Sequence, residues 1–356
     1  GNGISLVGGN LIKNTQTIAT FNITTTPGEL VITFTKTNGE TPTSADVDYI
    51  LQQITYANSS DDPPASAQID WSFDDGNTGG QGTGGAKQAT GSTTVTITAV
   101  NDTPTLAATP ADDSLTENTD VTSTAVFPTV TIDPIETGDS ISEAQVTLAG
   151  GLEDSDIINV NGTAITNLTT ASATGAALAS GGTYDYDHTT GVLTINFAGA
   201  TNTAAAEAIL QALTFGIDAS DNDPSTTART VTLNTVTDNG GGSDTSTDIS
   251  ETATISVGAV NDAPILSGNL TATMNEGATY TITGTDLGYT DPDDLDAGVT
   301  FTTSSAANGR IQVNGIDAST FTGTQLTAGQ VTFIHDSSET VAASFDVNVE
   351  DGNEDV

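Results

Sequence analysis

The sequence predicts an all-β fold in which β-sandwich domains follow one another in a linear rod, each with at most a short crossover helix. Two observations support this prediction. Apolar residues alternate with Thr, Ser and Asp along many short runs, as expected for strands with one face in a core and one face in water. Several of these runs also recur in the same order along the chain, which indicates repeated domains.

Five runs carry the strand signal most clearly, because their apolar residues occupy alternate positions. We expect these side chains, Trp71 included, to form the domain cores. In chain order they are Leu30, Ile32 and Phe34, then Ile69, Trp71 and Phe73, then Val95 and Ile97, then Leu193, Ile195 and Phe197, and last Phe345, Val347 and Val349.

Helical signals are scarce in this sequence. Residues 44–54 and 204–213 each predict one short helix. Thr43 and Asp46 form a capping-box pattern at the start of the first of these helices. In a β-sandwich, such a segment connects the two sheets.

The clearest repeat is the tetrapeptide Ala-Val-Asn-Asp, which occupies residues 99–102 and again residues 259–262. Each copy ends an alternating strand-like run and is followed two residues later by proline, so we interpret both copies as domain junctions. The boundaries then predict the C-terminal part of one repeat at residues 1–102, a complete repeat at residues 103–262, and a repeat lacking its final strand at residues 263–356.

An acidic motif also closes an alternating strand in each predicted unit. The motif is Asp-Gly-Asn at residues 75–77, Asp-Asn-Gly at residues 238–240 and Asp-Gly-Asn at residues 351–353. Because the chain has no starting Met and its end units are incomplete by this pattern, we expect it to be a segment of a longer protein.

Charge and composition restrict the possible partners. The 356 residues include 46 Asp and Glu against five Lys and Arg, for a formal net charge of −41, which repels nucleic acid and anionic membrane surfaces. No apolar run approaches the ~20 residues that a membrane span needs, so we expect no nucleic-acid partner and no membrane insertion in this segment. The absence of cysteine excludes disulfides and thiolate metal sites, so the thin cores need another stabilising element.

Calcium is the stabilising element that the acidic residues favour. Many carboxylates lie in short clusters with Asn and Gly at loop positions, and Ca²⁺ prefers six to eight oxygen ligands on flexible loops. The densest cluster is residues 291–296. It is not an EF-hand, because counting from Asp291 the sixth position is Asp296 instead of Gly and the twelfth is Thr302 instead of Glu. A solubilising acidic surface of halophile type is the alternative interpretation of the same charges.

The motifs together carry a family resemblance. Val-Asn-Asp-x-Pro at residues 100–104 and 260–264, the early Glu117 and Glu276, and Asp-Pro-Asp at residues 291–293 resemble the cadherin-like repeats of large bacterial calcium-dependent surface proteins and adhesins. The last unit also resembles the cadherin-like repeat of chondroitin-sulfate-proteoglycan type. The resemblance implies immunoglobulin-like Greek-key sandwiches, calcium at the junctions between domains, and an extracellular location, either secreted or on a bacterial cell surface.

The resemblance also implies a set of calcium ligands, with an early Glu, a mid-domain acidic loop and the Asn-Asp linker of one domain facing an Asp-rich loop of the next. The mid-domain Leu-Asp-Arg-Glu motif of animal cadherins is missing from this chain. The residues so assigned are Asp61, Asp62, Asn101, Asp102, Asp133 and Asp218 at the first junction, and Glu117, Asp221, Asp223, Asn261, Asp262, Asp291, Asp293 and Asp336 at the second.

The resulting functional prediction is a non-enzymatic, calcium-binding structural or adhesive repeat region. Neighbouring repeats of the same chain are its expected partners, together with other copies of itself or surface glycans. Two alternatives stay open, namely a self-assembling surface-layer or filament subunit in which copies complete one another's strands, and a glycan-binding module that uses the glycine-rich loop predicted at residues 76–91. Only two His and no Cys are present, so the usual zinc sites are excluded, and we expect no enzyme.

Overall fold

The computed structural model describes residues 2–23, 28–35, 41–78, 83–242 and 244–352. It contains two compact units, Gly1–Ile97 and Thr98–Val356. Strands make up 45% of it and helices 7%, which confirms the prediction of all-β sandwich domains with short helices. Within the described residues, no helix has the length and apolar character needed to cross a membrane.

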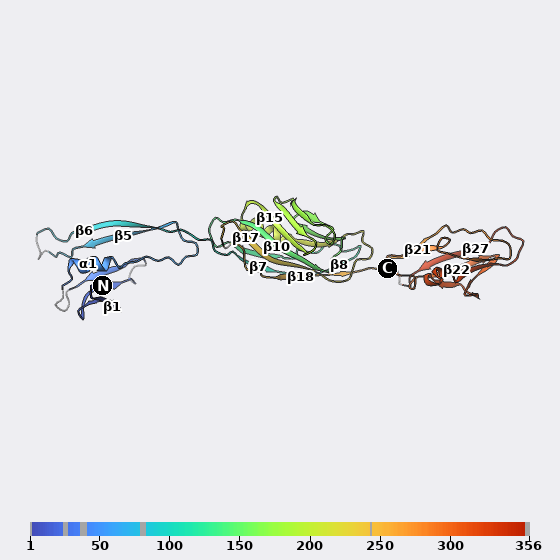
Figure 1. Ribbon diagram of the computed structural model, residues 1–356, viewed down its shortest axis with the longest axis horizontal. Coiled ribbons are helices and arrows are strands. Elements are labelled where there is room, and N and C mark those ends of the chain that lie inside the picture. Colours follow the sequence, from blue (N-terminus) through green and yellow to red (C-terminus); the bar gives the residue numbers. More distant parts are fainter. Residues whose placement is uncertain (1, 24–27, 36–40, 79–82, 243, 353–356) are drawn as a thin grey trace. The chain divides into compact units, whose positions relative to one another are not determined.

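The first unit consists of a four-stranded antiparallel sheet in the order β1-β2-β3-β4, one helix, and a separate two-stranded ribbon of β5 and β6 (Figure 1). Its elements are β1 (Ile4–Val7), β2 (Asn10–Lys13), β3 (Gln16–Asn22), β4 (Val31–Phe34), α1 (Ser44–Leu51), β5 (Ser66–Asp74) and β6 (Gln88–Thr96).

Helix α1 begins where the sequence predicts. The Thr43 side chain accepts a hydrogen bond from the Asp46 amide, and the Asp46 carboxylate accepts one from the Thr43 amide, which confirms the capping box. The same carboxylate lies 2.7 Å from Lys13 Nζ on β2, so it also ties the helix to the sheet. The pKa of Asp46 is lowered to about 2, mainly by its hydrogen bond with the Lys13 ammonium and to a smaller extent by the hydrogen bonds from Thr43.

The ribbon of β5 and β6 departs from the prediction. Ile69, Trp71 and Phe73 are 37%, 50% and 41% exposed, so the expectation that they form a core is wrong for this hairpin. Among the described residues β5 and β6 form a sheet of their own with no third strand, and these side chains are not enclosed by a second layer as those of the large sandwich are. Strand β6 begins at Gln88, so the loop predicted at residues 76–91 is shorter than expected, and residues 79–82 of it lie outside the described part.

The second unit begins with a large sandwich over residues 105–258. Its elements are β7 (Thr105–Thr109), β8 (Asp113–Thr116), β9 (Thr129–Asp133), β10 (Ile141–Gly150), β11 (Asp156–Val160), β12 (Thr163–Ile165), β13 (Ala173–Ala177), β14 (Thr183–Asp187), β15 (Val192–Thr201), α2 (Thr203–Gln211), β16 (Thr214–Ile217), β17 (Arg229–Asp238) and β18 (Glu251–Gly258).

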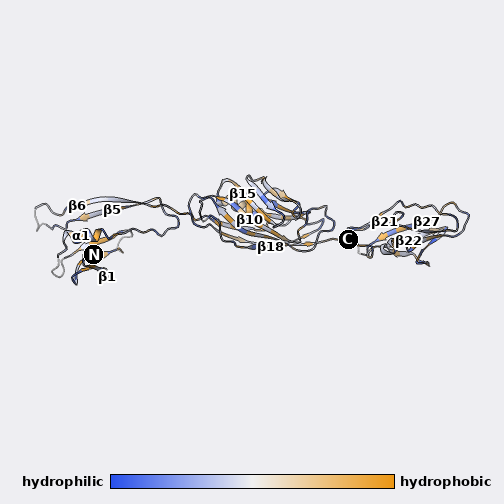
Figure 2. Cartoon of the chain, viewed as in Figure 1, coloured by the Kyte–Doolittle hydropathy of each residue, from blue (hydrophilic) through white to orange (hydrophobic). Residues whose placement is uncertain are grey.

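Seven of these strands form one sheet in the order β13-β14-β15-β10-β17-β18-β8, in which only β18 and β8 run parallel (Figure 1). The sheets β12-β11-β16 and β7-β9 complete the sandwich. Leu193 and Ile195 on β15 are 0% exposed and Phe197 is 7% exposed, as their alternation predicts. Apolar residues line β10 and β15, where Figure 2 shows the hydrophobic colour.

Helix α2 lies against β9 and confirms the second helix prediction. Its first turn is capped by the Asn202 side chain, which accepts a hydrogen bond from the Ala205 amide. Glu207 Oε1 accepts a hydrogen bond from the Ile132 amide at 2.8 Å, and Gln211 Nε2 donates one to the Val130 carbonyl at 3.0 Å. The helix therefore supplies hydrogen-bond partners to β9, which among the described strands pairs only with β7.

The last part of the second unit has its own core. Phe301 and Phe321 stack there with ring centroids 5.0 Å apart, and Phe345, Val347 and Val349 pack against that core. The five-residue helix α3 was not predicted. The elements are β19 (Ile265–Ser267), β20 (Thr279–Thr281), β21 (Gly288–Thr290), β22 (Thr300–Ala307), β23 (Gly309–Val313), β24 (Ile316–Asp317), β25 (Thr320–Thr322), α3 (Gly323–Thr327), β26 (Val331–His335) and β27 (Ser344–Glu350).

Candidate metal centre

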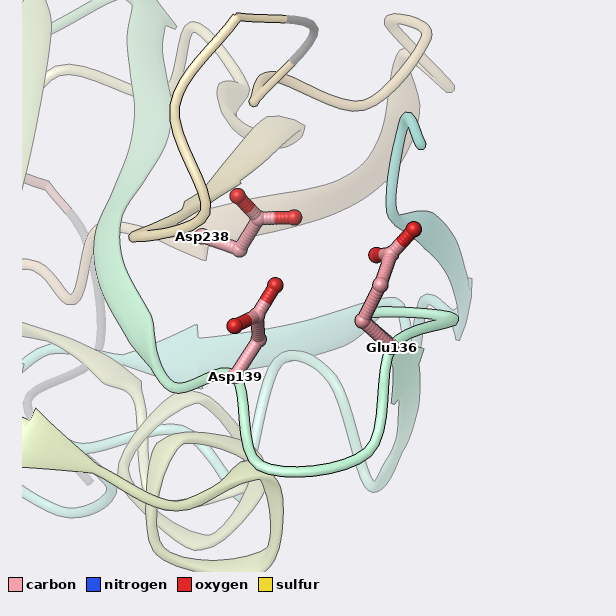
Figure 3. Close-up of side chains that lie close together, drawn as sticks. All are labelled: Glu136, Asp139 and Asp238. Carbon is pink, nitrogen blue, oxygen red and sulfur yellow. The ribbon is translucent and has the colours of Figure 1, made fainter. Parts of the chain in front are cut away.

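Three carboxylates of the second unit converge at one end of the large sandwich. Glu136 and Asp139 lie on the loop between β9 and β10, and Asp238 is the last residue of β17. One carboxylate oxygen from each lies within 4.8 Å of the others, and Figure 3 shows the three groups directed toward a shared space. With Asn101 we call these residues the first acidic cluster.

The Asn-Asp linker is bound to this cluster. Asn101 Nδ2 donates to Asp238 Oδ1 at 3.4 Å, and the Asp102 amide donates to Glu136 Oε1 at 2.8 Å. Asn239 Oδ1 accepts a hydrogen bond from the Ser140 amide at 2.8 Å, which holds the end of β17 against the loop. The repeated tetrapeptide therefore contributes directly to the cluster.

The electrostatics of the first acidic cluster favour a cation. Asp238 is 2% exposed, and its Oδ2 has no hydrogen-bond partner, nor has Glu136 Oε2. Burial raises the pKa of Asp238, and the charges of Asp139 and Glu136 raise it further. No ion pair of the described residues involves these carboxylates, so their charges face one another without a protein cation.

A glycine makes the close approach possible. A Cβ at Gly240 would lie 1.6 Å from Asn101 Oδ1 and 2.7 Å from Asp139 Oδ2. Any side chain at this position would therefore displace two of the oxygens that line the shared space.

A second acidic cluster has the same design. Carboxylate oxygens of Asp291, Asp294 and Asp351 lie within 4.8 Å of one another, and Asn261 Nδ2 donates to Asp351 Oδ2 at 2.6 Å. The Asp262 amide donates to Asp293 Oδ2 at 2.7 Å, as the Asp102 amide does to Glu136. The Oδ2 atoms of Asp291 and Asp262 are buried without a hydrogen-bond partner.

A third set of acids, which we call the Glu117 group, comprises Glu117, Asp221 and Asp223. Glu117 is 1% exposed, and its Oε2 accepts a hydrogen bond from the Val260 amide at 2.9 Å. Burial raises the pKa of Glu117, and the charges of Asp262, Asp293 and Asp221 add to the rise. The pKa of Asp223 is also raised, first by partial desolvation and then by the charges of Asp293, Asp221 and Glu153. Asp223 itself is exposed. The Glu117 group therefore adjoins the linker and Asp293 of the second acidic cluster.

The remaining residues that the resemblance assigned lie elsewhere. Asp133 and Asp336 are exposed, and each accepts a hydrogen bond from a backbone amide of its own turn. Asp218 does the same with the Ser220 amide and lines a depression of about 380 Å³ with Asp221 and Glu153. Asp61 and Asp62 are exposed residues of the loop before β5 in the first unit.

Sequence reasoning did not assign five of the clustered acids as ligands. A signal for two of them was present, since Asp238 and Asp351 begin the acidic motif that closes a strand in each unit. The remaining three lie in acidic loops whose partners are distant in sequence. These three are Glu136, Asp139 and Asp294.

Comparison with known proteins bears on the last part of the chain. Residues 264–356 match a family model described as cadherin-like, so this part of the chain resembles that family. No curated protein matches the chain. A solved structure of the surface layer protein SbsC, domains 4–9, aligns with 98% of this chain at 11% identity and a TM-score of 0.20, and the chain spans 44% of that structure.

Proposed function

We propose that the chain is a calcium-binding structural or adhesive repeat region of a large extracellular protein, without enzymatic activity. The observation that carries the proposal is a repeated one. Two Asn-Asp linkers lie 160 residues apart in the sequence. Each is hydrogen-bonded to a group of carboxylates that includes buried oxygens without a hydrogen-bond partner. The cadherin-like match over residues 264–356 supports the same function.

Repulsion within each cluster is the physical reason for a cation. Two unit charges 4.8 Å apart repel by about 3.5 kcal/mol at an effective dielectric constant of ~20, and by about 0.9 kcal/mol in water. A buried carboxylate without a counter-ion is costly, and a divalent ion removes both the repulsion and the desolvation cost. The clusters are therefore more stable with a cation than without one.

The donor atoms favour calcium over other cations. Every side chain of the two clusters is a carboxylate or an amide, and neither cluster contains His or Cys. Oxygen-only ligands on irregular loops suit Ca²⁺, which accepts six to eight of them at flexible angles, whereas Mg²⁺ demands near-ideal octahedral geometry. Backbone carbonyls and water would complete the coordination.

Calcium at the clusters would fix the linkers on the domains that follow them. Asn101 and Asp102 would be held to the first acidic cluster, and Asn261 and Asp262 to the second acidic cluster and the Glu117 group. The chain would then be stiffer with calcium than without it. Small-angle scattering with calcium and with EDTA tests this part of the proposal, and an unchanged maximum dimension would contradict it.

Calorimetric titration of calcium into the full chain tests the binding itself. We expect saturable binding that Asp238→Asn and Asp351→Asn each reduce in stoichiometry. Asp248→Asn is the matched control, because Asp248 is an exposed acid outside both clusters that accepts hydrogen bonds from Ser250 and Asn234, and this variant should bind as the parent does. Equal calcium binding by the parent and all three variants would contradict the assignment of the two clusters as calcium sites.

The exposed face of the β5 and β6 ribbon favours a second candidate function, self-assembly. Strand β17, which occupies the corresponding place in the next repeat, pairs with β10 on one edge and β18 on the other, while β5 pairs only with β6 among the described residues. An extended strand from another copy could occupy the open edge by β-augmentation. Electron microscopy should then show fibres or sheets, with a blue shift of Trp71 emission, and a dispersed monomer with unshifted emission would argue against assembly.

A further inference from the structure

Strand β10 carries an extra residue near its start, beside the first acidic cluster. In its pairing with β17, Ile141 lies opposite Asp238 and Glu143 lies opposite Thr237, so Ser142 has no residue of β17 opposite it. The pairing of β10 with β15 is interrupted at the same place. Ser142 is therefore the inserted residue of a β-bulge.

The inserted residue decides how the loop before β10 meets the end of β17. Buried residues alternate along β10 from Ala144 onward, and by the same alternation Ile141 would point away from the core. With Ser142 inserted, Ile141 is instead 0% exposed. Without the insertion, the loop would also be displaced by one residue along β17, which is about 3.4 Å in an antiparallel strand. That displacement is large compared with the 4.8 Å within which the carboxylate oxygens of the cluster lie.

The Ser142 side chain stabilises the bulge. Its Oγ donates to the Asp238 carbonyl at 2.9 Å and to the Thr237 carbonyl at 3.1 Å, so one hydroxyl is shared between two consecutive carbonyls at the end of β17. Two residues earlier, the Ser140 amide donates to Asn239 Oδ1 at 2.8 Å. Two cross-links therefore hold the start of β10 against Asp238 and the residue that follows it.

The first acidic cluster is the site that these contacts reach. Carboxylate oxygens of Glu136, Asp139 and Asp238 lie within 4.8 Å of one another, and the three groups are directed toward a shared space (Figure 3). Asp238 is 2% exposed, and its Oδ2 is buried without a hydrogen-bond partner. Its backbone is also fixed, since its amide donates to the Asp244 carbonyl at 2.8 Å and its carbonyl accepts from Ser142. The position of Glu136 and Asp139 relative to Asp238 therefore depends on how β10 begins.

In the described pairing of β22 with β27, no residue is inserted beside the second acidic cluster. Residues Thr300 to Ser304 of β22 lie opposite consecutive residues of β27, from Glu350 back to Asp346. The register shifts only beyond Ser304. The chain therefore offers a second cluster that has no equivalent of Ser142, against which its role can be tested.

We propose that Ser142 is a positioning residue for cation binding by the first acidic cluster, because its hydroxyl holds the bulge that sets the loop before β10 against Asp238. The inference rests on the proposed function, since it supposes that this cluster binds calcium. Ser142 acts through the backbone of Asp238 and is not itself a ligand. It fixes the ligands in advance, so that less conformational freedom is lost when calcium binds.

Calcium titration of Ser142→Ala in the full chain tests the inference. The titration is done in an Asp351→Asn background, which disables the second acidic cluster and leaves the first to be measured. We expect the affinity of the first acidic cluster to fall about 10-fold or more, the range measured when outer partners of metal ligands are removed. Ser142→Thr keeps the hydroxyl and should bind as the parent of that background does.

Thr147→Val is the matched control, because it also removes one hydroxyl between β10 and β17. Thr147 Oγ1 donates to Asn234 Oδ1 at 2.7 Å, beside the second register shift of the same strand pair, and neither residue belongs to a cluster. Both variants should lower the Tm in EDTA, but only Ser142→Ala should lower calcium affinity. In an Asp238→Asn background, where the second acidic cluster is measured instead, Ser142→Ala should leave the affinity unchanged.

The outcomes are distinct. A lower Tm with unchanged calcium affinity would overturn the inference and leave Ser142 a stabilising residue only. Equal losses of affinity in Ser142→Ala and Thr147→Val, or in Ser142→Ala and Ser142→Thr, would overturn it as well. If the parent chain bound no calcium, the proposed function would fail and the inference with it. Should Ser142→Ala not fold, Ser142→Cys replaces it, because a thiol has a similar shape and is a weak donor; we expect a several-fold loss of affinity, and an unchanged affinity would again count against the inference.

Discussion

Replacing Asp238 by Asn should have opposite effects on stability with and without calcium. Asp238 is 2% exposed, its Oδ2 has no hydrogen-bond partner, and one of its carboxylate oxygens lies within 4.8 Å of Glu136 and Asp139. The amide of Asn keeps nearly the same shape and one acceptor oxygen for the Gly240 amide. The change therefore removes mainly one negative charge.

The distances set the magnitude in the absence of calcium. At 4.8 Å or less, each pair repels by between about 0.9 kcal/mol at the dielectric constant of water and about 3.5 kcal/mol at an effective value of ~20. Glu136 and Asp139 are half-buried, so we use about 1–2 kcal/mol for each of the two pairs. Allowing for a weaker contact with Asn101, Asp238→Asn should stabilise the calcium-free large sandwich by about 1–3 kcal/mol, or roughly 2–10 °C in Tm.

In calcium, the parent should instead be more stable than Asp238→Asn. An ion at 100 times its Kd stabilises the parent by about 2.7 kcal/mol, and the variant should lose most of that gain. Differential scanning calorimetry of both proteins, once in EDTA and once in calcium, measures the two differences. The reasoning would be refuted if Asp238→Asn were less stable than the parent in EDTA, or if calcium stabilised both proteins equally.

Three further predictions concern other groups. In EDTA, the Tm of the second unit should rise as pH falls from neutrality toward the ordinary carboxyl range of about 4, because Glu117, Asp223 and Asp238 have raised pKa values and take up protons in the folded state first; a calorimetric Tm that falls would contradict this. Gly240→Ala should lower calcium affinity at the first acidic cluster about 10-fold or more in a titration. Gly284→Ala, where a Cβ meets nothing within 4 Å, should leave that affinity unchanged, and equal affinities for both variants would disprove the steric argument. The Asp46 pKa of about 2 gives the first unit stability that is present above pH ~4 and lost toward pH ~2; Lys13→Met should reduce this acid-dependent loss, followed by Trp71 emission, and an unchanged acid profile would contradict it.

The period-two pattern predicted which residues share a strand face. It succeeded fully where a second sheet packs on that face, as for Leu193 and Ile195 on β15. It failed for Trp71, because alternation specifies a face and says nothing of whether another strand covers it. Burial is a property of the assembled sheets, which the local sequence does not contain.

The candidate site was predictable to a similar extent. The linkers and Glu117 were proposed as ligands because their motifs recur or resemble those of a known family. In the structure, Asn101 and Asn261 donate to the carboxylates of Asp238 and Asp351, and Glu117 accepts from the Val260 amide. The sequence does not identify Glu136 and Asp139 as ligands, since Asp238 lies about 100 residues away and meets them only in the folded sheet. Ser142 gave no local signal at all, because the carbonyls that it binds lie on β17, about 95 residues away.

A crystal structure of the chain grown in saturating calcium tests the central claim most directly. We predict an ion among Glu136, Asp139 and Asp238, and another among Asp291, Asp294 and Asp351, each about 2.3–2.6 Å from the carboxylate oxygens. Density for water alone at both places, with the carboxylates turned apart, would contradict the account.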